Sequence, residues 1–144
     1  MMLSSTMRLL SGLILSLATG QALAAPVLIQ VQNVKTNTNP IRISLFANAQ
    51  DWQNERTTQA LRIDPAVLGT SSVLLDLPPG EYAFFLFHDL NNNRELERTW
   101  VGYPNEPYAF SNNFQLHMSR PTFNQLKFVV PAQGTTHKVI LVDP

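Results

Sequence analysis

The sequence predicts an all-β fold, an antiparallel β-sandwich of six to seven strands with one long loop. Three observations support this prediction. Short segments alternate apolar and polar residues at every second position, turns containing proline or glycine separate them, and no long amphipathic helix is present. Alternation with this period is typical of a strand with one buried face, and several short strands between turns are typical of a sandwich.

The first two predicted strands alternate clearly. In Val27 to Val34, valine and isoleucine occupy one face and glutamines occupy the other, and a similar alternation occurs in Ile41 to Ala47. The segment from Asn48 to Thr70 has little apolar periodicity. We interpret it as an excursion between strands that contains one helical turn, capped by Asp51.

Two further predicted strands flank a proline-rich turn. Ser72 to Leu77 alternates again, whereas Glu81 to His88 is apolar on both faces, which indicates a central strand covered on both sides. Residues 78–80 (Pro-Pro-Gly) lie between them. Because proline fixes φ and glycine accepts a positive φ, they predict a type II turn with Gly80 at φ > 0 between two paired strands.

The last two predicted strands are Gln125 to Val130 and Thr136 to Val142, joined as a hairpin through Pro131 to Thr135. The 36 residues from Asp89 to Asn124 form the long loop. Loops of more than about 15 residues are uncommon in compact domains unless they are functional or contain elements of their own. This one is rich in asparagine, proline and aromatic residues, so we expect the functional site here.

The N-terminus has the features of a secretory signal peptide. Arg8 precedes an apolar run from Leu9 to Ala18, and residues 22–24 (Ala-Leu-Ala) match the small-x-small cleavage pattern. The run is shorter than the about 20 residues of a spanning helix, although an uncleaved anchor is an alternative. We expect a signal peptide over residues 1–24, a single domain over residues 25–144 with no transmembrane segment, and a periplasmic or secreted location.

Composition and charge exclude several classes of function. Lysine plus arginine and aspartate plus glutamate each number 10, so there is no basic surplus for binding nucleic acid. Loss of Arg8 with the signal peptide leaves a net charge of −1. Cysteine is absent, although an exported protein has access to disulfides, so the fold must rest on packing, with or without a bound ion. The expected partner is an unidentified ligand or envelope protein.

The start of the long loop has the spacing of a calcium-binding loop, D-x-N-x-N-x-x-x-E. Oxygen-bearing side chains occupy its positions 1, 3, 5 and 9: Asp89, Asn91, Asn93 and Glu97. Position 6, glycine in such loops, is Arg94; position 12 is Trp100, and Glu106 is the candidate substitute ligand. An all-oxygen set favours calcium over zinc. The alternative is an asparagine-rich turn held by Asx side chains.

Aromatic residues of the same loop predict a second kind of site. Trp100, Tyr103 and Tyr108 carry flat faces that suit the stacking of a sugar or a peptide. Alternatively, these side chains attach the loop to the sandwich as a satellite core.

Catalytic motifs are missing from the sequence. His88, His117 and His137 are too widely spaced to indicate a zinc site, and neither a G-x-S-x-G elbow nor a glycine-rich phosphate loop occurs. We therefore predict a non-enzymatic module. An enzyme of unknown type centred on His88, Asp89 and Glu106 is the third hypothesis, after the calcium loop and the carbohydrate- or peptide-binding module.

Four motifs follow one another in a specific order. They are Asp76 to Ala83, His88 to Asn93, Gly102 to Asn113 and Arg120 to Phe123. In these motifs the chain resembles the family called domain of unknown function 2141, which consists of small exported bacterial proteins. The resemblance implies a β-sandwich similar to prealbumin (transthyretin) and an exported location, and it implies no activity. Where the family has glycine and aspartate in the loop, this chain has Arg94 and Glu97.

Overall fold

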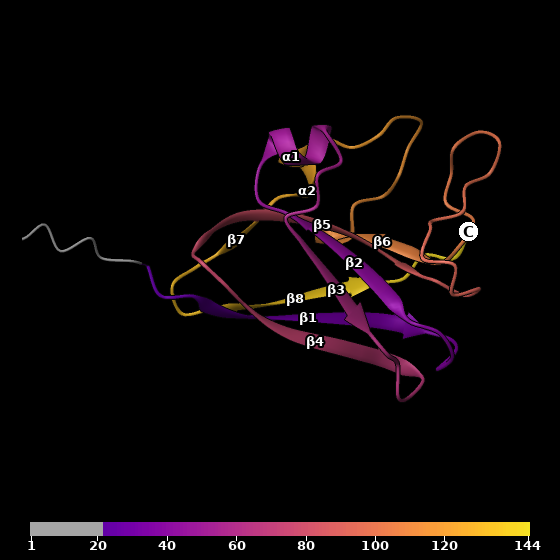
Figure 1. Cartoon of the computed structure of the whole chain (residues 1–144), viewed down its shortest axis with the longest axis horizontal. Helices are drawn as coiled ribbons and strands as arrows, with labels where there is room; N and C mark the ends of the chain where they lie inside the picture. The colour runs from indigo at the N-terminus through magenta and orange to yellow at the C-terminus, as the bar shows by residue number, and fades with distance from the viewer. Residues whose placement is uncertain (1–21) are drawn as a thin grey trace, which may run out of the picture.

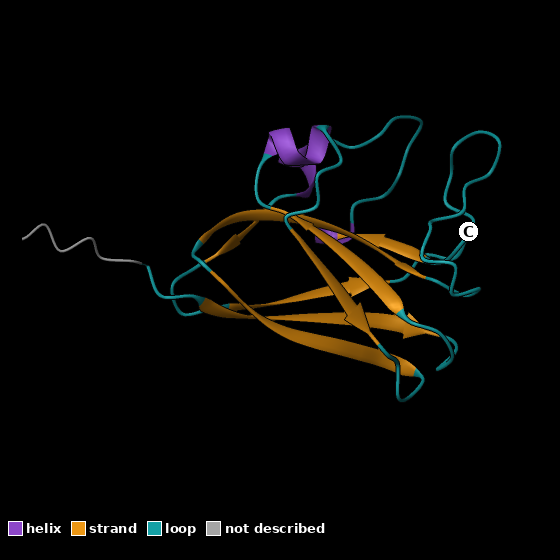
Figure 2. Cartoon of the chain, in the orientation of Figure 1, coloured by secondary structure: helices purple, strands orange, loops and turns teal. Residues whose placement is uncertain are grey.

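The structure, a computed structural model, describes residues 22–144 and is built mainly of β-strands in two open sheets (Figure 2). Its elements in chain order are β1 (Ala25–Val34), β2 (Ile41–Phe46), α1 (Ala49–Gln53), β3 (Gln59–Ile63), β4 (Gly69–Leu77), β5 (Gly80–His88), β6 (Tyr108–Phe110), the 3-10 helix η1 (Ser111–Asn113), α2 (Phe123–Leu126), β7 (Phe128–Val130) and β8 (Thr135–Ile140). Most of the predicted signal peptide, residues 1–21, lies outside this range. Within it, no helix is both long and apolar enough to span a membrane.

The two sheets lie in two layers (Figure 1). The first has the order β4-β1-β8, and the second has the order β3-β2-β5-β6, with β7 paired to the other end of β5. All pairs are antiparallel except β1 and β8, which run parallel, so the prediction of a purely antiparallel fold is wrong at that pair. The two α-helices cover the face of the second sheet that points away from the first.

The main core lies between the sheets and follows the predicted alternation. Val27, Ile29 and Val31 of β1 are fully buried in it, while the glutamines between them are half-buried. The central strand β5 contributes to two cores: Phe84 belongs to the core between the sheets, and Phe87 belongs to a second cluster beneath the helices and the long loop. The prediction that this strand is covered on both faces is confirmed.

The two predicted hairpins, through residues 78–80 and residues 131–135, are both wrong. In each case the two consecutive strands belong to different sheets. β4 pairs with β1 and β5 pairs with β2, so residues 78–79 carry the chain from one layer to the other. Gly80 pairs with Val130 and does not have a positive φ. The strands of the other predicted hairpin, on either side of residues 131–135, are β7 and β8. β7 pairs with β5, and β8 pairs with β1. The glycine with a positive φ in that connection is Gly134, where a Cβ atom would lie 2.2 Å from the carbonyl oxygen of Pro26.

Smaller differences concern the ends and number of the elements. The excursion from Asn48 to Thr70 contains a strand, β3, and its helical turn is capped by Asn48, whose Oδ1 accepts the backbone N–H of Asp51 at 2.8 Å. The predicted strand from Gln125 begins as α2, because the side chain of Gln125 accepts the backbone N–H of Thr122 at 2.9 Å and so caps a helical turn. With β6 and β7, residues 22–144 form eight strands rather than six or seven.

Candidate functional site: an anchored turn beside an aromatic cleft

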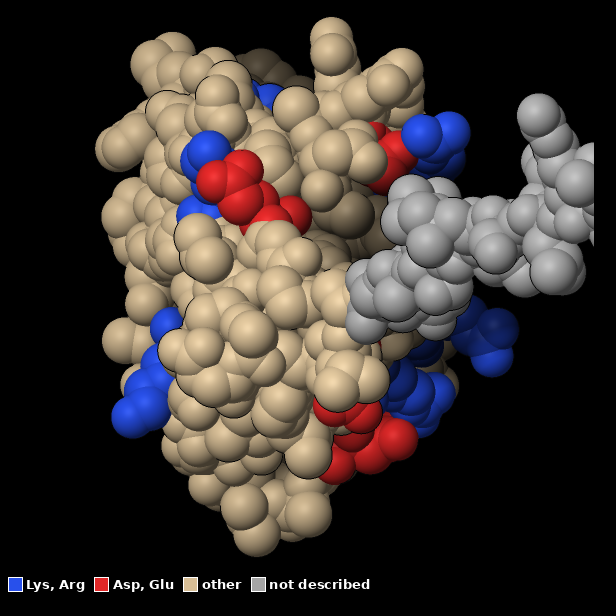
Figure 3. All heavy atoms as spheres, turned by 90° about the vertical axis from the view of Figure 1, so that its left-hand side faces the viewer, with Lys and Arg blue, Asp and Glu red and all other residues tan. Residues whose placement is uncertain are grey.

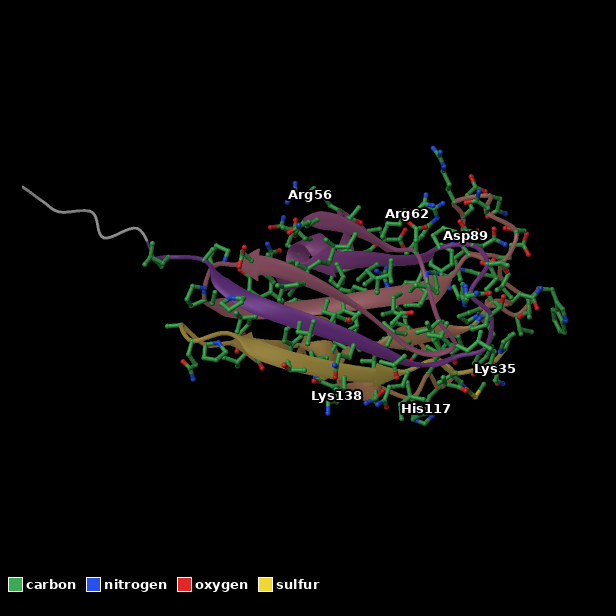
Figure 4. All side chains as sticks on the ribbon, turned by 90° about the horizontal axis from the view of Figure 1, so that it is seen from below. Lys35, Arg56, Arg62, Asp89, His117 and Lys138 are labelled. Atoms are coloured by element: carbon green, nitrogen blue, oxygen red, sulfur yellow. The ribbon has the colours of Figure 1, made fainter. Side chains whose placement is uncertain are left out.

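Asp89 is fully buried just after the end of β5, at the right-hand end of the molecule in Figure 4. Its Oδ2 accepts hydrogen bonds from Nε of Arg42 at 2.5 Å and from the backbone N–H of Arg94 at 3.0 Å. Its Oδ1 accepts the backbone N–H of Asn93 at 3.1 Å. Burial by itself raises the pKa of Asp89, but the hydrogen bonds and the charge of Arg42 outweigh it and lower that pKa. The carboxylate is therefore stabilised in its charged form.

The predicted oxygen ligands meet in the turn that Asp89 anchors. Asn91 and Asn93 donate their side-chain N–H groups to Oε1 of Glu97, at 2.5 and 3.2 Å. Arg94 has a φ of +69°, in the left-handed region, so it makes the sharp turn for which calcium loops use glycine. The spacing read from the sequence thus corresponds to one compact turn with oxygen side chains on it.

Glu106 lies behind this turn and is only 3% exposed. Its two carboxylate oxygens accept the backbone N–H groups of Leu90 at 3.0 Å and of Glu97 at 3.4 Å. Burial raises the pKa of Glu106, and the nearby negative charges of Asp89 and Glu97 add to the rise, against the two backbone hydrogen bonds. Glu106 therefore holds both ends of the turn together from inside the protein.

The structure offers a limited fit for a metal ion. Among residues 22–144, no group of three or more histidine, aspartate or glutamate side chains is arranged to hold one. The turn instead brings together two asparagines and two carboxylates, and one of these carboxylates, Asp89, already pairs with Arg42. The amide oxygens of Asn91 and Asn93 accept the backbone N–H groups of Asn93 at 3.2 Å and of Glu95 at 2.9 Å, which are the contacts of an Asx-type turn. A hard cation would share these oxygens with backbone N–H groups, at low total charge.

His88 completes the structural contacts around the turn. Its Nε2 lies 3.1 Å from the carbonyl oxygen of Thr38 and 3.2 Å from that of Asn39. His88, Asp89 and Glu106, the three residues of the enzyme hypothesis, thus each contact backbone groups. None of them lines the cleft on the outer face of the second sheet.

That cleft has a volume of about 540 Å³ and lies on the outer face of the second sheet, between residues 98–104 and residues 116–121. Phe46, Phe85 and Phe110 line it from β2, β5 and β6. The rings of Phe85 and Phe110 lie 4.9 Å apart between centroids, and Phe85 is only half-buried. Phe46 and Phe110 are themselves buried members of the second core cluster, at 5% and 6% exposure, so Phe85 is the most exposed ring of the aromatic floor that these strands give the cleft.

The first wall of the cleft is a tight turn. The backbone N–H of Thr99 donates to the carbonyl of Tyr103 at 2.7 Å, and that of Gly102 donates to the carbonyl of Thr99 at 2.9 Å. Trp100, at the tip of this turn, is 97% exposed. Tyr103 lines the cleft, and its hydroxyl donates to the carbonyl of His117 at 2.9 Å, which links this wall to the opposite one.

The second wall carries a guanidinium group held in a fixed position. Arg120 lies over the ring of Trp52, with its central carbon 4.4 Å from the ring centroid. It donates to the carbonyl of Trp52 at 2.6 Å and to the carboxylate of Glu55 at 3.0 Å. Arg98 lines the cleft from the first wall.

The three predicted aromatic ligands therefore lie in different places. Tyr103 lines the cleft and Trp100 lies at the tip of its wall, whereas Tyr108 is buried in β6 and packs edge-to-face on Phe110, with ring centroids 5.9 Å apart. Sequence reasoning missed the arginines of the cleft, because isolated exposed arginines carry no local signal. It also missed Arg42 as the partner of Asp89, because the two lie 47 residues apart in the chain.

Charged residues do not form an extended patch on the face drawn in Figure 3. That face is mostly uncharged, and several of its groups of charged side chains contain both signs. The fold and the site together define a small two-sheet β-domain with an aromatic-floored cleft beside a carboxylate-anchored turn.

The chain belongs to the DUF2141 family, described as an uncharacterized protein conserved in bacteria, whose sequence profile matches residues 29–138. The match confirms the family resemblance drawn from the four motifs, and it includes the whole turn and the whole cleft. No curated protein and no solved structure matches the chain.

Proposed function

We propose that the protein is an exported, non-enzymatic binding module with a prealbumin-like β-sandwich fold, and that its cleft binds a carbohydrate or a peptide. The observation that carries the proposal is the aromatic floor of the cleft combined with polar walls from Arg98, Tyr103 and Arg120. Ligand sites of proteins are typically concave, with apolar and aromatic surface and a few placed polar groups. Aromatic faces suit amphipathic ligands such as sugars and peptides.

Export and the sandwich architecture are supported by the position of the first strand and by the core. β1 begins at Ala25, the residue that follows the proposed cleavage site, so removal of residues 1–24 leaves every described element intact. The two sheets share one apolar core, which supports the proposed sandwich, since the two sheets of a sandwich pack face to face. The periplasm, or the medium after secretion, is the proposed location.

Binding is tested by titrating the intact domain against a glycan array and a peptide array, with tryptophan fluorescence as the readout in solution. We expect Trp100→Ala or Tyr103→Ala to weaken binding about tenfold, which corresponds to about 1.4 kcal/mol. Leu74→Ala, at an exposed position on the first sheet, is the matched control and should bind as the unaltered protein does. Binding that is unaffected by Tyr103→Ala would contradict the cleft as the site.

A calcium-organised turn is the second candidate function, and a specific observation favours it. Arg94 takes the left-handed conformation that a calcium loop requires at position 6, with oxygen-bearing side chains at the positions that ligate in such loops, Asp89, Asn91, Asn93 and Glu97. Only two of these four side chains are charged, and Arg42 competes for one of them. Calcium would therefore bind with a dissociation constant of about 10⁻⁴ to 10⁻³ M.

The calcium proposal predicts a thermal shift. At a free concentration ten times the dissociation constant, binding stabilises the fold by about 1.4 kcal/mol, and the melting temperature rises by roughly 3 to 6 °C. Excess chelator should abolish the rise, magnesium should produce less of it, and Glu97→Gln should remove it. Glu95→Gln, a neighbouring exposed carboxylate outside the ligand spacing, is the matched control. Millimolar calcium that gives neither heat nor a melting shift would leave Asp89 as the anchor of a purely structural turn.

A further inference from the structure

We propose, on the basis of the cleft as a ligand-binding site, that its ligand is an acidic oligosaccharide whose carboxylate pairs with Arg98, with Arg120 as a further N–H donor. Three properties of the cleft restrict the chemical class of its ligand. They are its charge, the fixed position of one arginine, and the mixture of polar and aromatic groups that line it.

The charge of the cleft is positive, although the whole chain is neutral. Its permanently charged lining residues are Arg98, Arg120 and Glu55. Glu55 pairs with Arg120, whereas Arg98 makes no ion pair in the described part of the chain and donates only to the carbonyl of Gly102, at 3.2 Å. One guanidinium thus lacks a counter-charge beside an aromatic floor, which favours a ligand that carries a negative group.

The position of Arg120 is fixed before any ligand arrives. Stacking on Trp52 and hydrogen bonds to Trp52 and Glu55 hold the plane of its guanidinium group. Because both of its terminal nitrogens already donate to these partners, Arg120 offers a ligand only its remaining N–H groups, whereas the guanidinium fork of Arg98 has no carboxylate partner and matches the two oxygens of one. A carboxylate is therefore the anionic group that the cleft suits best.

A saccharide fits the remaining lining better than an acyl chain does. Hydroxyl side chains of Ser44, Thr57 and Ser119 line the same space as the aromatic side chains of Phe85 and Tyr103. An acyl chain would leave these hydroxyl groups without partners, whereas a sugar presents hydroxyl groups for them and C–H faces for the aromatic rings.

A peptide that adds a strand is also disfavoured. The edge strand beside the cleft is β6, and Tyr108 on that strand already exchanges two backbone hydrogen bonds with Val142, at 3.0 and 2.8 Å. A peptide that binds by strand addition needs a free row of backbone groups, and this three-residue edge has little of it left.

The experiment titrates the domain with hexamers of galacturonate, mannuronate and guluronate, and with maltohexaose as the neutral probe, using tryptophan fluorescence and calorimetry. We expect at least one oligouronate to bind tenfold or more tightly than maltohexaose, and sodium chloride to weaken that binding. Arg98→Gln should reduce the affinity for the oligouronate about tenfold and leave thermal unfolding unchanged. Lys138→Gln, which removes a positive charge from a residue that does not line the cleft, should change neither.

The outcomes separate this inference from the binding function on which it rests. Equal affinity for charged and neutral hexamers, lost in Tyr103→Ala, would keep the binding cleft and overturn the acidic ligand. Tighter binding of octanoate or of an acidic peptide than of any oligouronate would overturn the saccharide. If neither the arrays nor any of these probes bind, both the cleft function and the inference fail.

Discussion

The two halves of the 89–121 segment differ in how they use their polar groups. In residues 89–97, backbone N–H groups donate to two buried carboxylates, Asp89 within this half and Glu106, which reaches back from the second half. In the cleft walls of the second half, residues 98–104 and 116–121, large side chains stand in solvent, with Trp100 97% and Met118 98% exposed.

One long loop can thus contain both an ordered turn and an open binding site. A turn whose buried polar groups are all satisfied is rigid, because opening it leaves donors and acceptors without partners. The exposed half begins directly after this turn, and η1 holds its later part against β8: the backbone N–H of Asn112 donates to Nε2 of His137 at 2.9 Å. The cleft is thus held between two anchors.

Removal of the first anchor, the buried carboxylate of Asp89, should lower the free energy of unfolding more than any other change considered. Asp89→Ala leaves Arg42 and two backbone N–H groups without their acceptor, and a broken buried ion pair costs about 3 kcal/mol. Asp64→Ala, which breaks an exposed pair with Arg62, should cost about 0.5 kcal/mol. Urea denaturation of both variants measures the contrast. Equal losses would mean that the 89–97 turn does not anchor the fold.

The second anchor is the hydrogen bond between His137 and Asn112, and its contribution to stability should depend on pH. Burial lowers the pKa of His137 below its ordinary value of 6.5, so the neutral ring belongs to the folded state. Its contribution is complete above pH 6.5 and is lost as the pH falls through the lower pKa of the folded protein, because a protonated Nε2 no longer accepts the N–H of Asn112. The loss should be about 1 kcal/mol, since the ring is partly exposed.

Thermal melting of variants between pH 7.5 and pH 5 isolates this effect. His137→Gln should remove the pH-dependent part that the unaltered protein has, and His117→Gln, at an exposed position, should keep it. The same pH profile in all three proteins would show that the hydrogen bond of His137 does not hold η1.

A substitution at Arg94 should raise the stability of the protein slightly, whereas the changes above lower it. Its φ of +69° costs about 1 kcal/mol for a side-chain-bearing residue, and glycine avoids that cost but loses more entropy on folding. Arg94→Gly should therefore stabilise the protein by about 0.5 kcal/mol, visible as a higher urea midpoint. A lower midpoint would indicate that the Arg94 side chain itself holds the turn.

The smallest effects on stability belong to the exposed half. Trp100→Ala and Met118→Ala remove side chains that stand almost entirely in solvent, so the free energy of unfolding should change by less than about 0.5 kcal/mol. Chemical denaturation checks both. A loss of 2 kcal/mol in either variant would place that side chain in a packed core, and the contrast between the two halves would disappear.

The sequence predicts those parts of the fold that local pattern determines. β1, β2, β4 and β5 alternate or are apolar on both faces, and all four were found within two or three residues of their predicted bounds. β3 was missed because four of its five residues are exposed or half-buried and leave no alternation. Which strands pair was mispredicted, because residues 78–80 resemble a turn between neighbours although they connect two layers.

In the candidate site, too, the sequence predicts what local spacing determines and does not predict what strand pairing determines. The turn at Asp89 has a local spacing that the sequence displays, and the structure places its four oxygen side chains in one turn. The cleft has no such spacing, because its floor comes from three strands and its arginines come from two separate loops. A site assembled from Phe46, Phe85 and Phe110 requires the pairing of β2, β5 and β6, which the sequence pattern does not specify.

Hydrogen–deuterium exchange of the whole domain, with and without an oligouronate, tests the division between anchor and binding site most directly. We expect slow exchange at the amides of Leu90, Asn93 and Arg94 in both states, since each donates to a buried carboxylate. We expect faster exchange in residues 116–119, where no backbone N–H donates to another residue of the described chain, and protection there when the oligouronate binds. Rapid exchange at Asn93 and Arg94, or protection that grows in residues 89–97 instead of the cleft walls, would contradict the division between anchor and binding site.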